Sequence, residues 1–190
     1  ALQQFHVYDP GFDIWKKYGK HIKHILTHFR QGTLFNIHMM DDGLIHAGQE
    51  FKALTWMDAV VYDTPVTPRH GSPVEISALW YNAIRFSLEL AEASGDRKFI
   101  NEWKEVPGLI ESSFVKTFWY EEGGYLADCV KEGHKDISVR PNQVIAAAMV
   151  YSPLSNEMKK SILDVVEGEL LTPRGLRTLS PKNPAYKGVY

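Results

Sequence analysis

Asp58 is the carboxylic acid of this sequence whose neighbours best suit acid catalysis. It lies in the segment LTWMDA at residues 54–59, between apolar side chains. An apolar, aromatic surround disfavours the charged form of a carboxyl group, which then stays protonated and can donate to a leaving oxygen. Trp56 could stack on a sugar ring. The alternative is that Asp58 caps a turn and Trp56 is part of the core, because loop aspartates usually cap or turn.

Two charged residues further along the chain could bind substrate. Arg69 could hold sugar hydroxyls with its fixed fork of donors, or pair with a carboxylate such as Asp63. Glu75 follows Ser72 by three residues, and a capping box at a helix start would account for it without any ligand. Both readings of each residue stay open at this point.

A cluster of polar residues stands at a predicted helix start near residue 141. Arg140, Asn142 and Gln143 could point at a ligand from there, or be the ordinary polar residues of a first helical turn. Asp128, in the segment before this helix, is a weaker candidate.

Other kinds of catalytic site have little support. His21, His24 and His28 have helical spacing, but Lys17 and Lys20 lie among them and would repel a metal ion, so a solvated helix face is expected. No nucleophile elbow and no phosphate-binding glycine loop occurs in the sequence. We therefore expect neither a cofactor nor a metal.

The composition indicates one packed domain with uncharged partners. Apolar residues make up 44% of the chain, which is ample for a core. The net charge is −2 and no run of five like charges occurs, so neither nucleic acid nor a membrane surface is an expected partner. No apolar run approaches the roughly 18 residues of a membrane helix. The single cysteine, Cys129, excludes an internal disulfide framework and fits a cytoplasmic location.

Apolar residues at helical spacing and capping signals predict five helices. The helices are expected at about residues 9–30, 72–95, 96–118, 141–149 and 155–168. The third is expected to kink at Pro107. Strand signals are few, so the predicted fold class is all-α.

The connections between these helices differ greatly in length. Two are tight turns, whereas residues 31–71, 119–140 and 169–190 form long segments. If sequential helices pack antiparallel, these long segments lie at one common end of the assembly. Loops beyond roughly 15 residues are uncommon unless they have a function. We therefore expect the functional site at this end, with Asp58 in the longest segment.

Five motifs, in this order, resemble the amylo-α-1,6-glucosidase domain of glycogen debranching enzymes. They are DGLIHAG at 42–48, LTWMDA at 54–59, VTPR with PVEI at 66–69 and 73–76, RPNQ at 140–143, and LTPRGLRTL at 171–179. The resemblance covers about residues 42–190, and the first forty residues add little to it.

The resemblance implies a fold, a reaction and a substrate. The fold is a portion of an (α/α)6 toroid of the six-hairpin glycosidase type, with the active site at one end of the inner helices. The reaction is hydrolysis, with inversion, of the α-1,6-linked glucose at a branch point of glycogen or a related branched oligosaccharide. Asp58 matches the position of the general acid. The family match also favours sugar binding by Arg69, and its motif alone proposes Arg177 as a substrate contact.

The family's catalytic base lies on a glutamate-containing loop well after the motif at 171–179, so the base is expected outside these residues. We expect residues 1–190 to be a single partial domain, a central slice that is inactive alone and that packs against the remainder of its parent chain or against itself. Two alternatives remain. One is another toroidal glycosidase, similar to a glucoamylase or trehalase, and the other is a fragment that binds carbohydrate without catalysis.

Overall fold

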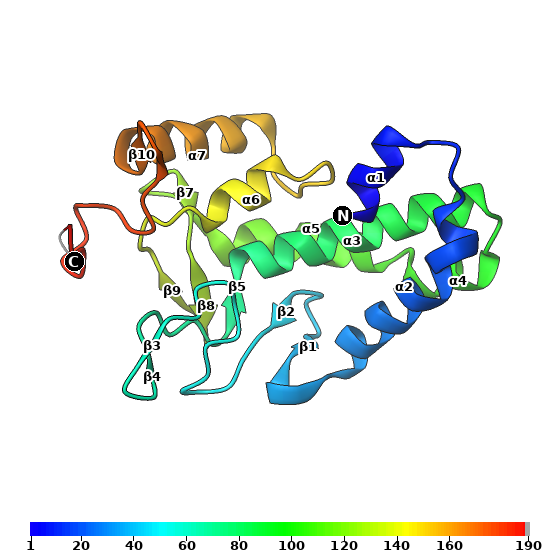
Figure 1. Ribbon diagram of the computed structural model, residues 1–190, viewed down its shortest axis with the longest axis horizontal. Coiled ribbons are helices and arrows are strands. Elements are labelled where there is room, and N and C mark those ends of the chain that lie inside the picture. Colours follow the sequence, from blue (N-terminus) through cyan, green and yellow to red (C-terminus); the bar gives the residue numbers. More distant parts are fainter. Residues whose placement is uncertain (189–190) are drawn as a thin grey trace.

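The computed structural model describes residues 1–188 as helices joined by short antiparallel strands (Figure 1). The α-helices are α1 (Leu2–Tyr8), α2 (Ile14–Gln31), α3 (Val74–Ala93), α4 (Arg97–Trp103), α5 (Val106–Phe118), α6 (Asn142–Ala148) and α7 (Asn156–Glu169), and a 3-10 turn, η1, covers Leu34–Asn36. None of the helices within residues 1–188 is long and apolar enough to cross a membrane.

The strands are two or three residues long. They are β1 (His38–Met39), β2 (Ile45–His46), β3 (Val60–Val61), β4 (Thr64–Pro65), β5 (Ser72–Pro73), β6 (Trp119–Tyr120), β7 (Tyr125–Leu126), β8 (Cys129–Lys131), β9 (His134–Asp136), β10 (Leu171–Thr172) and β11 (Gly175–Leu176). Four pairs are hairpins, β1-β2, β3-β4, β6-β7 and β10-β11, and a three-stranded sheet has the order β5-β8-β9.

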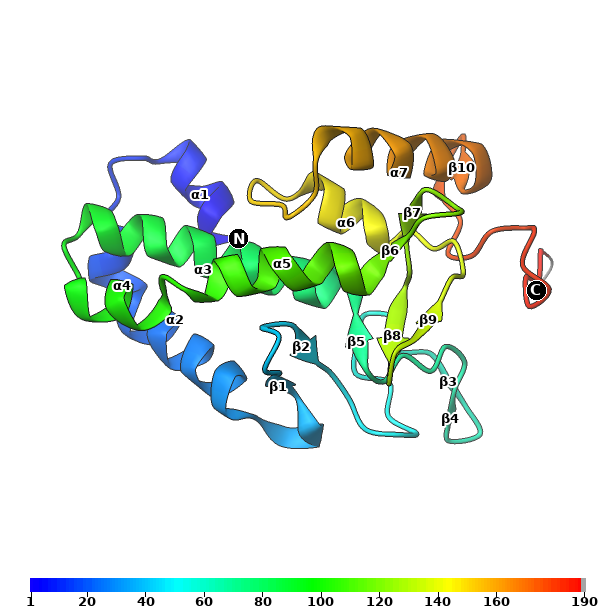
Figure 2. The ribbon, with the colours of Figure 1, turned by 180° about the vertical axis from the view of Figure 1, so that it is seen from behind.

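Helix α3 is the centre of the helical part. It contacts α2, α4, α5 and α6, and α5 runs beside it on the face seen in Figure 2. Because α3 has neighbours on several sides, most of its surface is buried, and an apolar sequence suits this place. Fully buried residues along α3 are Val74, Ala78, Ile84 and Ala91. At the end of α4, the buried ring of Trp103 packs edge-on against Trp80 of α3.

The predicted helices occur, with shifts that local chemistry explains. Helix α2 starts after Asp13, whose carboxylate accepts a hydrogen bond from the Lys16 N–H, rather than at residue 9, where a turn follows α1. The helix predicted over residues 96–118 is two helices, α4 and α5. Pro107 lies in the first turn of α5, where its missing N–H leaves no hydrogen bond unmade. Ser155 caps α7, as predicted.

The expectation of an all-α chain forming part of an (α/α)6 toroid is wrong. The three long segments, predicted to be loops, fold into antiparallel hairpins and the β5-β8-β9 sheet, while α2, α4, α5 and α6 pack around α3 and α7 packs on α6. Strands of two or three residues are too short to show a period-two pattern in the sequence. Their turns instead use left-handed backbone at Tyr62, Asp63, Glu132 and Gly133.

The β3-β4 hairpin, the β5-β8-β9 sheet and β10 lie toward the end of the molecule where α3 begins, whereas the β1-β2 hairpin lies nearer its middle, beside α2 (Figure 1). Gly71 lets the segment before β5 lie close to β8. Its backbone bridges Ala47, its φ is +125°, and a Cβ there would lie 2.5 Å from the Val130 carbonyl oxygen. Only glycine lets the segment that leads into β5 approach β8 this closely.

Candidate functional site

Arg69 is a buried cation held between two carboxylates. Its terminal nitrogens donate to both oxygens of Glu75 at 2.6 Å, and its Nε donates to Asp128 at 2.7 Å. The exposed fractions of Arg69, Glu75 and Asp128 are 5%, 1% and 2%. Bidentate pairing of this kind fixes geometry as well as charge.

Three elements bring these charges together. Arg69 lies just before β5, Glu75 lies in the first turn of α3, and Asp128 lies just before β8. β5 and β8 pair antiparallel, with Pro73 opposite Cys129, so the residues that flank the two strands meet. The Asp128 carbonyl oxygen also accepts hydrogen bonds, from the Val74 N–H and from Arg69.

The charges of this network are balanced. Arg140 lies with its Nε 3.7 Å from Asp128, so two cations face two carboxylates. Burial lowers the pKa of the Arg69 guanidinium. The hydrogen bonds to Glu75 and the charge of Asp128 outweigh burial and raise this pKa above its ordinary value, so Arg69 stays protonated. Burial raises the pKa of Asp128, and Arg69 and Asn142 offset only part of that effect.

Asn142 joins the network to the segment that carries Asp58. Its amide nitrogen donates to Asp128 Oδ1 at 2.6 Å, and its amide oxygen accepts from the indole N–H of Trp56 at 2.7 Å. Arg69 also donates to Thr55 Oγ1, at 3.1 Å. The structure therefore brings together Trp56, Arg69 and Asn142 from distant parts of the chain.

Other sequence candidates lie at or beyond the edge of this network. Arg140 donates to the Thr178 carbonyl oxygen at 3.2 Å, while its buried Nε has no hydrogen-bond partner among the described residues. Gln143 is 1% exposed and links the Leu126 N–H to the Arg140 carbonyl oxygen. Arg177 contacts the Leu171 carbonyl oxygen, within the segment of its own hairpin.

Asp58 is exposed. The apolar surround expected from its neighbours does not form, since Trp56 is itself 53% exposed. Within residues 1–188, Asp58 makes no side-chain hydrogen bond or ion pair. Asp58 lies two residues beyond the anchored Trp56, and the backbone carbonyl of Ala59 accepts from the Val66 N–H where the β3-β4 hairpin begins.

Two sequence interpretations are corrected here. Arg69 does pair with carboxylates, but with Glu75 and Asp128 rather than with Asp63, which lies at the tip of the β3-β4 hairpin. The capping box is wrong, because α3 starts at Val74 and both oxygens of Glu75 bind Arg69. No local sequence pattern marks Asp128 as a partner of Arg69, because the two residues are 59 positions apart.

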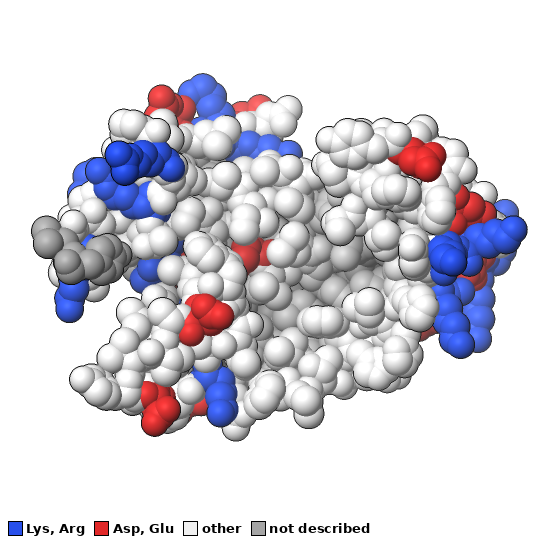
Figure 3. Space-filling model, in the orientation of Figure 1, with Lys and Arg blue, Asp and Glu red and all other residues white. Residues whose placement is uncertain are grey.

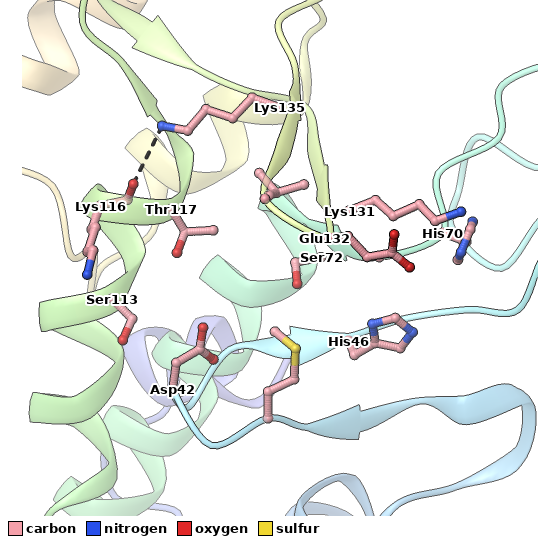
Figure 4. Close-up of a pocket in the computed structure, with 14 residues that line it drawn as sticks. Asp42, His46, His70, Ser72, Ser113, Lys116, Thr117, Lys131, Glu132 and Lys135 are labelled. Carbon is pink, nitrogen blue, oxygen red and sulfur yellow. Dashed lines mark hydrogen bonds between the residues drawn. The ribbon is translucent and has the colours of Figure 1, made fainter.

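A cavity of about 610 Å³ opens beside the network, between α5, the β1-β2 hairpin and the β5-β8-β9 sheet. Figure 4 shows Asp42, Ser113 and Thr117 on one side of it, and His46, His70 and Glu132 on the other. Neither Trp56 nor Asp58 lines this cavity.

Three histidines lie next to one another, and two of them, His46 and His70, line that cavity. The ring centroids of His38 and His46 are 5.3 Å apart, and those of His46 and His70 are 6.5 Å apart. Burial lowers the pKa of His46, and the neighbouring His38 lowers it further. In the described part of the chain, no group of three or more His, Cys, Asp or Glu residues is arranged to hold a metal ion.

The family model for amylo-alpha-1,6-glucosidase matches residues 1–190, and the chain belongs to this family of glycoside hydrolases. The match includes the first forty residues, which had added little to the resemblance read from the motifs.

Two similar proteins illustrate this relationship. The chain is 27% identical over 197 residues to the glycogen debranching enzyme of Saccharomyces cerevisiae (strain ATCC 204508 / S288c), a match that covers 82% of this chain and 13% of the yeast protein. Among solved structures, a GH78 family rhamnosidase of Bacillus sp. GL1 is similar with a TM-score of 0.58 and 20% identity, over 90% of this chain and 15% of that one. The second likeness shows the fold alone, and it does not define an all-α toroid.

Proposed function

We propose that this chain takes part in hydrolysing α-1,6-glucosidic branch linkages in glycogen or related α-glucans, with inversion and with Asp58 as the general acid. One observation carries the proposal within this family. The indole N–H of Trp56 is anchored to buried Asn142, while 53% of the Trp56 surface stays exposed, two residues from exposed Asp58. A fixed aromatic face beside a carboxyl group is what stacking on a sugar and protonating its leaving oxygen require.

The surface charge is consistent with an uncharged ligand. Figure 3 shows that Lys, Arg, Asp and Glu are sparse in the middle of the face shown and are more frequent toward its two ends. The net charge of −2 offers no strong field for a charged polymer. A branched α-glucan is neutral, so its recognition depends on stacking and on hydrogen bonds to its hydroxyl groups.

In the proposed reaction, Asp58 donates its proton to the glycosidic oxygen while the bond from that oxygen to the anomeric carbon breaks. A water molecule attacks the opposite face of the sugar and loses its proton to a second carboxylate, roughly 6.5–9.5 Å from the first. Glu75 and Asp128 are unsuited to this second role, because both are buried and bound to Arg69. We propose, from the family resemblance, that the base lies outside residues 1–190.

The proposed substrate contacts differ in whether they have exposed surface or unused hydrogen-bond donors. Trp56 presents an open ring face, and Arg140 and Arg177 each use one terminal nitrogen on a carbonyl oxygen, which leaves further guanidinium donors. Arg69, Glu75, Asn142 and Gln143 are buried and bind other protein groups. For these four we propose an indirect part in binding, through the segments they hold.

The deciding experiment is Asp58→Asn in the complete protein that carries this chain. The amide keeps the shape of the carboxyl group but cannot donate the acid proton, so release of glucose from branch stubs should fall at least about 100-fold. Binding of a branched oligosaccharide, followed by calorimetry, should stay near the parent value. Residual activity within about tenfold of the parent would contradict the role of Asp58. Binding with no glucose release by the parent itself would favour a carbohydrate-binding role without catalysis.

A further inference from the structure

The segment before Asp58 is held by side chains rather than by backbone pairing. Within residues 1–188, the backbone of residues 55–58 makes no hydrogen bond to another backbone group. Instead, Thr55 Oγ1 accepts from Arg69 at 3.1 Å, and Trp56 donates to Asn142 at 2.7 Å. The thioether sulfur of Met57 lies 3.4 Å from the Asn142 amide nitrogen. Each of the three residues before Asp58 therefore contacts the buried network.

The chemistry of the partners fixes the orientation of Asn142. An indole N–H can only donate, so the amide must turn its oxygen toward Trp56. Its nitrogen then faces the Asp128 carboxylate, which can only accept when ionised. Asn142 is 0% exposed, and Asp128 is in turn held by the Arg69 guanidinium. Trp56 is thus anchored by a neutral hydrogen bond to Asn142, which is held in turn by buried, charge-assisted hydrogen bonds among Asn142, Asp128 and Arg69.

Asp58 has no comparable support of its own. A general acid must come within about 2.6–3.2 Å of the oxygen that it protonates, and a misplacement of about 1 Å can lower the rate about 100-fold. The place of Asp58 is therefore set through residues 55–57 and through the groups that hold them.

We propose that Arg69 and Asn142 are positioning residues, which place Asp58 through their hydrogen bonds to Thr55 and Trp56. This inference rests on the proposed role of Asp58 as the acid, and it assigns to the buried ion-pair network a part in the reaction besides its part in the fold. Neither Arg69 nor Asn142 needs to touch the substrate.

The test removes the two hydrogen bonds by changing Thr55 and Trp56, so that Arg69 keeps its ion pairs with Glu75 and Asp128. Thr55→Val keeps the shape of the side chain and removes the hydroxyl, and Trp56→Phe keeps an aromatic ring and removes the indole N–H. Both changes are small and lie outside the core, so folding should persist, and a thermal melt checks it. Trp119→Phe is the control, since the half-buried Trp119 donates its indole N–H to exposed Glu121 and not to the buried network.

Two substrates separate positioning of the acid from general damage. With a branched dextrin, kcat should fall about tenfold in each single variant and further in the double variant, because the leaving oxygen needs the proton of Asp58, while KM changes less. With α-D-glucosyl fluoride, whose fluoride leaves without protonation, kcat of Thr55→Val, which changes no proposed substrate contact, should stay within about threefold of the parent. Trp119→Phe should match the parent on both substrates.

Two results would overturn the positioning role. Equal loss of kcat on both substrates would mean that the hydrogen bonds serve only the structure, and an unchanged kcat on the dextrin would mean that they do not set Asp58. Failure of the proposed function looks different, because Asp58→Asn itself would then hydrolyse the dextrin at the parent rate.

Discussion

The indole N–H of Trp56 donates to the side-chain oxygen of Asn142 at 2.7 Å, across 86 positions of sequence. This bond joins an exposed aromatic residue to a buried charge network. The bond holds the ring in one orientation while about half of Trp56 stays exposed to solvent. Stacking on a sugar needs an exposed ring that is held in this way.

Trp56→Ala should weaken binding of a branched oligosaccharide, because it removes the exposed ring. The loss should be about 1 kcal/mol, near the value of an aromatic contact, and Trp56→Phe should lose less. Calorimetry in the Asp58→Asn background measures binding without hydrolysis. Trp119→Ala serves as the control for loss of an indole elsewhere, and equal affinity of Trp56→Ala and the parent would show that the ring does not contact the ligand.

Arg69→Met should destabilise the fold strongly, because Glu75 and Asp128 would remain as buried, unpaired carboxylates. The expected loss is about 3–5 kcal/mol in the free energy of unfolding, measured in urea. Lys160→Met is the matched control, since it breaks an exposed ion pair with Asp164, and exposed pairs of this kind contribute little to stability. Similar losses in the two variants would mean that burial adds nothing to the importance of Arg69.

Acid should loosen the contact between α2 and α4 through Asp96. Hydrogen bonds from the Lys23 ammonium and then from the Phe99 N–H hold the pKa of Asp96 below its ordinary value. Such a group adds stability that is fully present above the unfolded pKa of about 3.9 and is lost as the pH falls through the lower folded value. The melting temperature should therefore drop less from pH 5 to pH 3 in Asp96→Asn than in the parent.

A second variant separates the charge of Asp96 from its capping role. Asn also caps helices well, so Asp96→Asn keeps the cap of α4, whereas Asp96→Ala should lose about 1 kcal/mol more at neutral pH. An identical pH response of the parent and Asp96→Asn would exclude this carboxylate from the acid transition.

The isolated 190-residue chain should self-associate and release no glucose. Ile25 and Leu79 are 55% and 43% exposed, and both line an apolar groove of about 430 Å³ between α1, α2 and α3. Exposed apolar surface of this kind favours association. Light scattering after gel filtration measures the mass, and Leu79→Lys should shift it toward the monomer. A monomeric chain that releases glucose from a branched dextrin would contradict both the association and the base proposed outside these residues.

Local chemistry in the sequence was enough to predict several elements of this protein. Ser155 caps α7 and Asp96 caps α4, because a capping side chain needs only the N–H groups two or three residues ahead. The run of apolar residues from Val74 predicted α3, although its start moved from the cap expected at Ser72. The LTWMDA segment and four further motifs were enough to indicate the family, which the match over residues 1–190 confirms.

Only the tertiary structure decided which charges meet. Asp63 is six positions from Arg69 in sequence, as Glu75 is, yet Arg69 binds Glu75 and the distant Asp128. The pairing of β5 with β8 brings Asp128 to Arg69, whereas the pairing of β3 with β4 places Asp63 at a hairpin tip. The packing of α6 against α3 places Asn142 between Trp56 and Asp128. A buried charge needs a partner of opposite charge, and the packing of distant elements decides which residue that partner is. Unlike a cap or a helical period, this packing cannot be predicted from a local stretch of sequence.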